Sequence, residues 1–99
     1  YHFASSMLKE FGFSEGKQIL VEERQRDADP EFPTTPFPNP EEKGALALSI
    51  EKATALQADY IIANDPDADR FTAAERSGNG FQQFTGDELG IIFADWMIL

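Results

Sequence analysis

The stretch "DYIIANDPDADRF", residues 59–71, runs from an apolar segment directly into three aspartates at every second position. Its first part, residues 59–64, predicts a short strand, and the continuous apolar centre is typical of a strand covered on both faces. Alternate side chains of an extended segment point the same way, so Asp65, Asp67 and Asp69 are expected to converge beyond the strand. The stretch therefore predicts a buried strand that ends in an acidic site.

Before this stretch, residues 2–11 predict an amphipathic helix that ends at Gly12. Residues 18–23, QILVEE, predict a second short strand because they are apolar and rich in residues that favour strands. Between the two strands the chain is therefore expected to form a loop and a helix.

Residues 24–43 hold five of the six prolines of the chain. Proline removes backbone donors, so this stretch predicts a loop, and its two phenylalanines favour a loop pinned against the domain over a free linker. A helix is predicted to follow over residues 41–57, with Asn39 as its N-cap and Glu42 completing a capping box.

After the acidic motif, FTAAER (71–76) and FQQF (81–84) flank SGNG, which predicts a β-hairpin. Residues 85–99 predict a final helix, with a capping box formed by Thr85 and Glu88 and an apolar face of Leu89, Ile92, Phe93 and Trp96. Helices and strands thus alternate along the chain.

This order predicts an α/β protein, a layered αβα domain with a mostly parallel (mixed) sheet. A length of 99 residues suits one domain over residues 1–99. The first helix has no strand before it, so the expectation is that the first strand is truncated and that the chain is a piece of a longer protein.

The composition excludes several classes of function. A formal net charge of -10 argues against nucleic acid or an anionic membrane as partner. The chain has no cysteine, which excludes thiolate zinc sites and fits a reducing compartment. It also has no apolar run of the roughly 20 residues needed to span a bilayer.

Three hard oxygen ligands favour Mg²⁺, Mn²⁺ or Ca²⁺ over zinc for the acidic motif. An EF-hand loop is excluded, because its sixth position from Asp65 is Arg70 instead of glycine and its twelfth is Arg76 instead of glutamate. A haloacid-dehalogenase nucleophile loop would place threonine or valine where Asp69 stands. From the residues alone, a solvated acidic turn stays open as the alternative.

Two strings together, "DPEFPTTPFPNPEE" (29–42) and "ADYIIANDPDADR" (58–70), resemble the second, metal-binding domain of the α-D-phosphohexomutase superfamily. The N-D-P-D-A-D-R form resembles its type-2 phosphoglucomutase/phosphopentomutase branch. The resemblance implies a cytoplasmic four-domain enzyme of carbohydrate metabolism. Such an enzyme moves a phosphate within a sugar phosphate through a phosphoserine and a bisphosphate intermediate.

Carried over by position, the resemblance implies that Asp65, Asp67 and Asp69 bind Mg²⁺ against a phosphoserine from another domain. Arg70 would lie beside the phosphoryl group, with a salt bridge that only pins the carboxylates as the alternative. The sugar phosphate and the phosphoserine would both be supplied to this chain by the other domains of the parent enzyme.

The family's nucleophile lies in a T-A-S-H-N-P-type string, which residues 1–99 do not contain. Ser5 and Ser6 are expected to be ordinary serines on a helix surface, and His2 a solvated terminal residue. The chain is therefore expected to supply one wall of an active site and no catalysis alone. A non-catalytic cation-binding or interaction module is the alternative from a different class.

Overall fold

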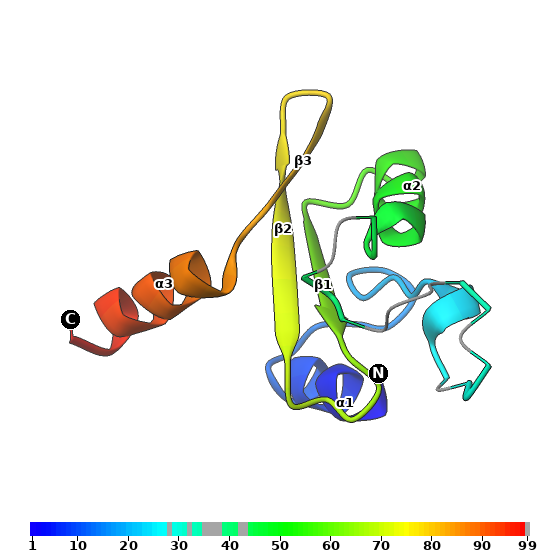
Figure 1. Ribbon diagram of the computed structural model, residues 1–99, viewed down its shortest axis with the longest axis horizontal. Coiled ribbons are helices and arrows are strands. Elements are labelled where there is room, and N and C mark those ends of the chain that lie inside the picture. The colour runs from blue at the N-terminus through cyan, green and yellow to red at the C-terminus, as the bar shows by residue number, and fades with distance from the viewer. Residues whose placement is uncertain (28, 32, 35–38, 42–43, 99) are drawn as a thin grey trace. The chain divides into compact units, whose positions relative to one another are not determined.

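The computed structural model describes residues 1–99 except 28, 32, 35–38, 42–43 and 99, and it divides into two compact units (Figure 1). The first unit is Tyr1–Pro36 and the second is Phe37–Leu99. The predicted pinning by Phe32 and Phe37, and the capping role of Glu42, fall outside the described residues.

In the first unit, α1 (His2–Glu10) confirms the predicted N-terminal helix. Gly12 has a φ of 97°, and its N–H donates to the carbonyl of Lys9, while the N–H of Phe13 donates to the carbonyl of Leu8. This pair of hydrogen bonds is a Schellman motif, which needs a left-handed residue where glycine stands. The predicted helix end is confirmed.

The strand predicted over residues 18–23 is wrong. Ile19 forms only a single bridge, to Glu15, because the N–H groups of Gln18 and Ile19 both donate to the carbonyl of Ser14 in a local turn. A short 3₁₀ helix, η1 (Glu23–Gln25), follows. Backbone donors that are used in a turn cannot enter a strand ladder.

The second unit contains the sheet. Its elements in chain order are α2 (Ala47–Ala55), β1 (Tyr60–Asn64), β2 (Phe71–Ser77), β3 (Gly80–Gln83) and α3 (Gly86–Ile98) (Figure 1). The strand order is β1-β2-β3, and both pairs are antiparallel. The α/β class and the predicted hairpin are confirmed.

The expectation of a mostly parallel sheet is wrong for the strands that the structure describes. The loop between β1 and β2 comprises only residues 65–70, and a parallel connection needs a crossover of a dozen or more residues. The paired residues Asn64 and Phe71 flank this loop, so β2 turns back alongside β1.

The core of the second unit lies between α2 and one face of the sheet. Leu46, Ala53, Ile61 and Ala74 are buried there. On the opposite face of β1, Tyr60 and Ile62 are exposed. The prediction that both faces of this strand are covered is therefore wrong within the described residues of the second unit.

The helix predicted over residues 41–57 begins only at Ala47. Gly44 has a φ of 86°, a left-handed conformation that interrupts a right-handed helix. The side chain of Asn39 accepts the N–H of Glu41 at 3.1 Å, which forms a turn there instead of an N-cap.

Arg76 of β2 connects the end of α2 to the sheet. Its guanidinium donates to the carbonyl of Ala58 at 2.7 and 3.1 Å and to the carbonyl of Ala53 at 3.2 Å. The same group lies 5.0 Å from the centroid of the Phe81 ring. Arg76 thus satisfies carbonyls at the helix end, where a positive charge is also favourable.

The capping box predicted for the last helix is confirmed. The N–H of Thr85 donates to the Glu88 carboxylate at 2.8 Å, and the N–H of Glu88 donates to Thr85 Oγ1 at 3.2 Å. On the expected apolar face Leu89 is buried and the Phe93 ring lies 5.8 Å from that of Phe71, while Trp96 is 79% exposed. No helix in the described part of the chain is long and apolar enough to cross a membrane.

Candidate metal centre

The acidic motif forms the connection between β1 and β2. The N–H of Asp65 donates to the carbonyl of Arg70 at 3.2 Å, which closes the base of the loop. The carbonyl of Asp65 accepts the N–H of Ala68 at 3.1 Å, so residues 65–68 form a β-turn with Pro66 at its second position, which suits proline. Asn64 adds a side-chain hydrogen bond to the carbonyl of Arg70 at 3.4 Å.

Ala68 has a φ of 61°, in the left-handed region that non-glycine residues seldom adopt. The prediction from the spacing, an extended segment with alternating side chains, is therefore wrong here. The reversal at Ala68 brings Asp69 back toward Asp65 instead. Alanine carries no sequence signal for this conformation, and so the residue that shapes the loop was not predicted.

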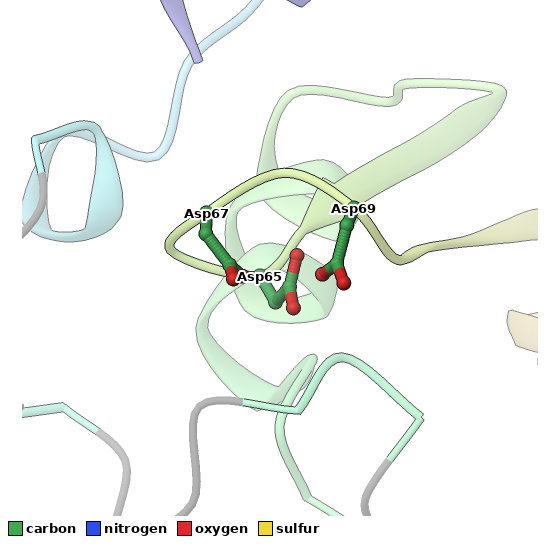
Figure 2. A group of neighbouring side chains, drawn as sticks. All are labelled: Asp65, Asp67 and Asp69. Carbon is green, nitrogen blue, oxygen red and sulfur yellow. The ribbon is translucent and has the colours of Figure 1, made fainter.

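The predicted convergence of the three aspartates is nevertheless present. One carboxylate oxygen from each of Asp65, Asp67 and Asp69 lies within 4.8 Å of the other two. Figure 2 shows Asp67 and Asp69 on opposite limbs of the loop, with all three carboxylates near one another. The turn, and not strand alternation, produces this cluster.

Asp65 differs from its two neighbours because its side chain is fully buried and hydrogen-bonded. Its Oδ1 accepts the backbone N–H of Arg70 at 3.1 Å, and its Oδ2 accepts Nε of Arg70 at 2.8 Å. The Arg70 side chain is 53% exposed, and its Nε lies 3.8 Å from Asp69 Oδ1. The salt bridge that the sequence left as an alternative for Arg70 is thus present.

The pKa values of two aspartates move in opposite directions. Burial alone would raise the pKa of Asp65, but the side-chain and backbone N–H groups of Arg70 outweigh it and hold that pKa well below its usual range. The pKa of Asp69 is raised, first by its hydrogen-bonding contact with Asp65 and then by the negative charges of Asp65 and Asp67. The cluster carries more negative charge than Arg70 alone neutralises.

These residues fit a divalent cation. Carboxylate oxygens are the hard ligands that Mg²⁺, Mn²⁺ and Ca²⁺ prefer, and Asp67 and Asp69 are exposed and can be reached from solvent. The loop offers a fixed carboxylate at Asp65 and two open ones beside it. Such a cluster can hold one divalent ion at the edge of the sheet.

Comparison with known proteins places this loop in a family. Residues 1–78 match the family model described as phosphoglucomutase/phosphomannomutase, alpha/beta/alpha domain II. The chain belongs to the phosphoglucomutase/phosphomannomutase family. The predicted resemblance is therefore confirmed, and residues 1–78 correspond to domain II of such enzymes.

Curated relatives extend this match. The chain is 49% identical over 92 residues to the probable phosphoribomutase of Schizosaccharomyces pombe, covering 93% of this chain and 15% of that protein. It is 49% identical over 76 residues to phosphopentomutase of Mus musculus, covering 75% of this chain and 12% of that protein. It is 41% identical over 99 residues to glucose 1,6-bisphosphate synthase of Homo sapiens, covering 98% of this chain and 15% of that protein.

The chain thus spans about 15% of the length of the first relatives. No solved structure matches the chain significantly.

Two further sequence expectations concern the first unit. Ser5 is buried, with an exposed fraction of 5%, and its Oγ has no hydrogen-bond partner among the described residues, so its expected place on the helix surface is wrong. His2 is solvated as predicted, with a hydrogen bond to Asp27 at 3.2 Å. Neither residue belongs to the loop between β1 and β2.

Proposed function

We propose that this chain is the Mg²⁺-binding domain of a phosphoglucomutase or phosphopentomutase. The proposed reaction moves a phosphate within a sugar phosphate through a phosphoserine and a bisphosphate intermediate. The observation that carries the proposal is the approach of three carboxylates to within 4.8 Å on one loop of a domain II chain. The relatives, which include a phosphopentomutase and a glucose 1,6-bisphosphate synthase, support the same class of enzyme.

In this proposal Asp65, Asp67 and Asp69 hold the ion, and the buried Asp65 has a different role from the two exposed aspartates. Asp65 is immobilised by two hydrogen bonds from Arg70, which fixes the position of one carboxylate in advance. Asp67 and Asp69 are exposed and supply the open oxygens. A bound Mg²⁺ supplies positive charge that offsets the negative charge of a transferring phosphoryl group.

Arg70 is the proposed neighbour of the phosphoryl group. Its Nε is directed to Asp65, while 53% of its side chain is exposed, so an oxyanion could approach the side chain from solvent. Guanidinium groups suit phosphate because several N–H donors lie in one plane. We propose that the ion pair and this role coexist in the same residue.

The phosphoserine and the sugar phosphate would come from other parts of a longer, cytoplasmic four-domain enzyme, in which residues 1–99 form one domain. No nucleic acid and no membrane takes part in this proposal. Residues 1–99 contain no T-A-S-H-N-P-type string, so this chain alone is expected to be inactive.

Metal binding can be tested by calorimetric titration of Mg²⁺ and Mn²⁺ into the full chain and into Asp67→Asn. This substitution keeps the shape of the side chain and removes one of the open ligand charges, so we expect at least a tenfold loss of affinity. Asp95→Asn removes the same charge from an exposed position of α3 and is expected to leave binding unchanged. Equal binding by the chain and Asp67→Asn would contradict the proposed site.

An activity assay separates the mutase from a non-catalytic cation-binding module. The full-length protein that contains this chain is assayed with hexose and pentose 1-phosphates, together with its Asp67→Asn variant. We expect turnover that Asp67→Asn largely abolishes. Metal binding without turnover on either sugar phosphate would favour the module instead.

A further inference from the structure

Arg70 makes two contacts with Asp65 that are separable by mutation. The backbone N–H donates to Oδ1 at 3.1 Å, and the side-chain Nε donates to Oδ2 at 2.8 Å. Only the second contact depends on the identity of the side chain. The turn itself is closed by backbone hydrogen bonds from Asp65 and Ala68, which a substitution at residue 70 leaves in place.

The guanidinium and a divalent cation would be attracted by the same negative charges. Nε of Arg70 lies 2.8 Å from Asp65 Oδ2 and 3.8 Å from Asp69 Oδ1, and the ligand oxygens of all three aspartates lie within 4.8 Å of one another. A cation that binds among these oxygens therefore comes close to a positive charge that already pairs with them. The two cations repel each other, and each weakens the hold of the other on the carboxylates.

From this geometry we infer that Arg70 is an internal counter-ion of the acidic loop, which competes with the divalent cation for Asp65 and Asp69. The inference rests on the proposed function, because it assumes that the loop binds a metal. Arg70 lowers the metal affinity of the loop, and metal binding in turn weakens the Arg70–Asp65 ion pair. The weakened pair leaves the guanidinium freer to receive an oxyanion.

The competition predicts that removal of the Arg70 guanidinium raises metal affinity, whereas the loss of its contact with Asp65 would suggest a lower affinity. If the guanidinium mainly held Asp65 in place, its removal would weaken metal binding. Because the backbone N–H of residue 70 continues to hold Asp65, we expect the loss of positive charge to dominate. For charges roughly 5 Å apart in a water-exposed, salt-screened site, removal of the repulsion tightens binding of a divalent ion about fivefold.

The test is a calorimetric titration of Mn²⁺ into the full chain and its variants at constant ionic strength. Arg70→Met is expected to bind about fivefold more tightly, whereas Arg70→Lys keeps the charge and is expected to stay within about twofold of the unaltered chain. Lys52→Met removes one positive charge from the last turn of α2, at the opposite end of β1, and is expected to change little. Weaker or unchanged binding by Arg70→Met would overturn the inference.

Asp67→Asn, measured alongside, separates the two proposals. Loss of binding in Asp67→Asn together with unchanged or weaker binding in Arg70→Met overturns the competition and leaves the metal site intact. Absence of Mn²⁺ binding by the unaltered chain overturns both.

A second measurement needs no substitution. The Nε–H resonance of Arg70 in the unaltered chain is followed by NMR while Mg²⁺ is added. We expect it to shift and to exchange faster with water as the ion pair weakens, and a resonance unchanged at saturating Mg²⁺ would overturn the inference.

Discussion

Replacement of Arg76 by methionine should destabilise the second unit more than any ordinary surface substitution. Methionine keeps an unbranched apolar side chain but removes the guanidinium, which donates to the carbonyls of Ala53 and Ala58 at distances from 2.7 to 3.2 Å. It also removes a positive charge from the end of α2 and from the face of the Phe81 ring, whose centroid lies 5.0 Å away. Three favourable terms therefore disappear together.

The magnitude follows from these contacts. Hydrogen bonds from a charged donor contribute about 1.5–3 kcal/mol, a positive charge at a helix C-terminus about 0.3–1, and a partly exposed cation–π contact about 0.5–1. The terms share one charge and do not add fully, so we expect a loss of about 2–3 kcal/mol in the free energy of unfolding. In a chain of this size that corresponds to a fall in Tm of roughly 10–20 °C.

The assay is urea unfolding followed by far-UV circular dichroism, with Arg76→Lys and Lys17→Met as controls. Lysine keeps the charge, but one ammonium lacks the planar fork that reaches both carbonyls, so about half of the loss is expected. Lys17 is exposed, and its replacement should change stability by less than about 0.5 kcal/mol. A similarly small loss in Arg76→Met would refute the reasoning, because it would mean that the carbonyls of Ala53 and Ala58 are equally well satisfied by water.

Two further predictions concern backbone conformation and pH. Gln57 has a φ of 57° where a Schellman motif favours glycine, so Gln57→Gly should raise stability by about 0.5 kcal/mol; a fall in Tm would contradict this. The folded-state pKa of Asp65 lies below its unfolded value, so its stabilisation is complete above about pH 4 and is lost as pH falls through the folded pKa. The free energies of unfolding in urea of the chain and of Arg70→Met should therefore differ less in acid than at pH 7. A difference that does not change with pH would contradict the assignment of this stabilisation to Asp65.

The two helix ends show why some boundaries were predictable. The left-handed residue lies two positions beyond each helix, at Gly12 after α1 and at Gln57 after α2, and both ends use the same pair of hydrogen bonds around it. A glycine in the sequence predicts that left-handed conformation, whereas a glutamine does not. The capping box of Thr85 and Glu88 is similarly visible in sequence because both partners lie within one turn.

The sheet was harder to predict because strand pairing depends on distant parts of the chain. QILVEE has the composition of a strand, but its backbone donors are used in the turn at Ser14. Alternating helices and strands favour a parallel sheet, yet the six residues of 65–70 are too few for a parallel crossover. Loop length was the better signal for β1 and β2, since it limits the geometry directly.

The acidic motif shows what spacing can and cannot predict about a site. Aspartates at every second position are expected to converge, and they do converge, although through a turn at Ala68. They are not equivalent, because Arg70 follows Asp69 in sequence but pairs most closely with Asp65, across the loop. That pairing lowers the pKa of Asp65, while the pKa of Asp69 is raised by its negatively charged neighbours. Substitution by asparagine should therefore have different effects at the two positions. Asp65→Asn should disturb the fold of the loop, whereas Asp67→Asn should change only its charge.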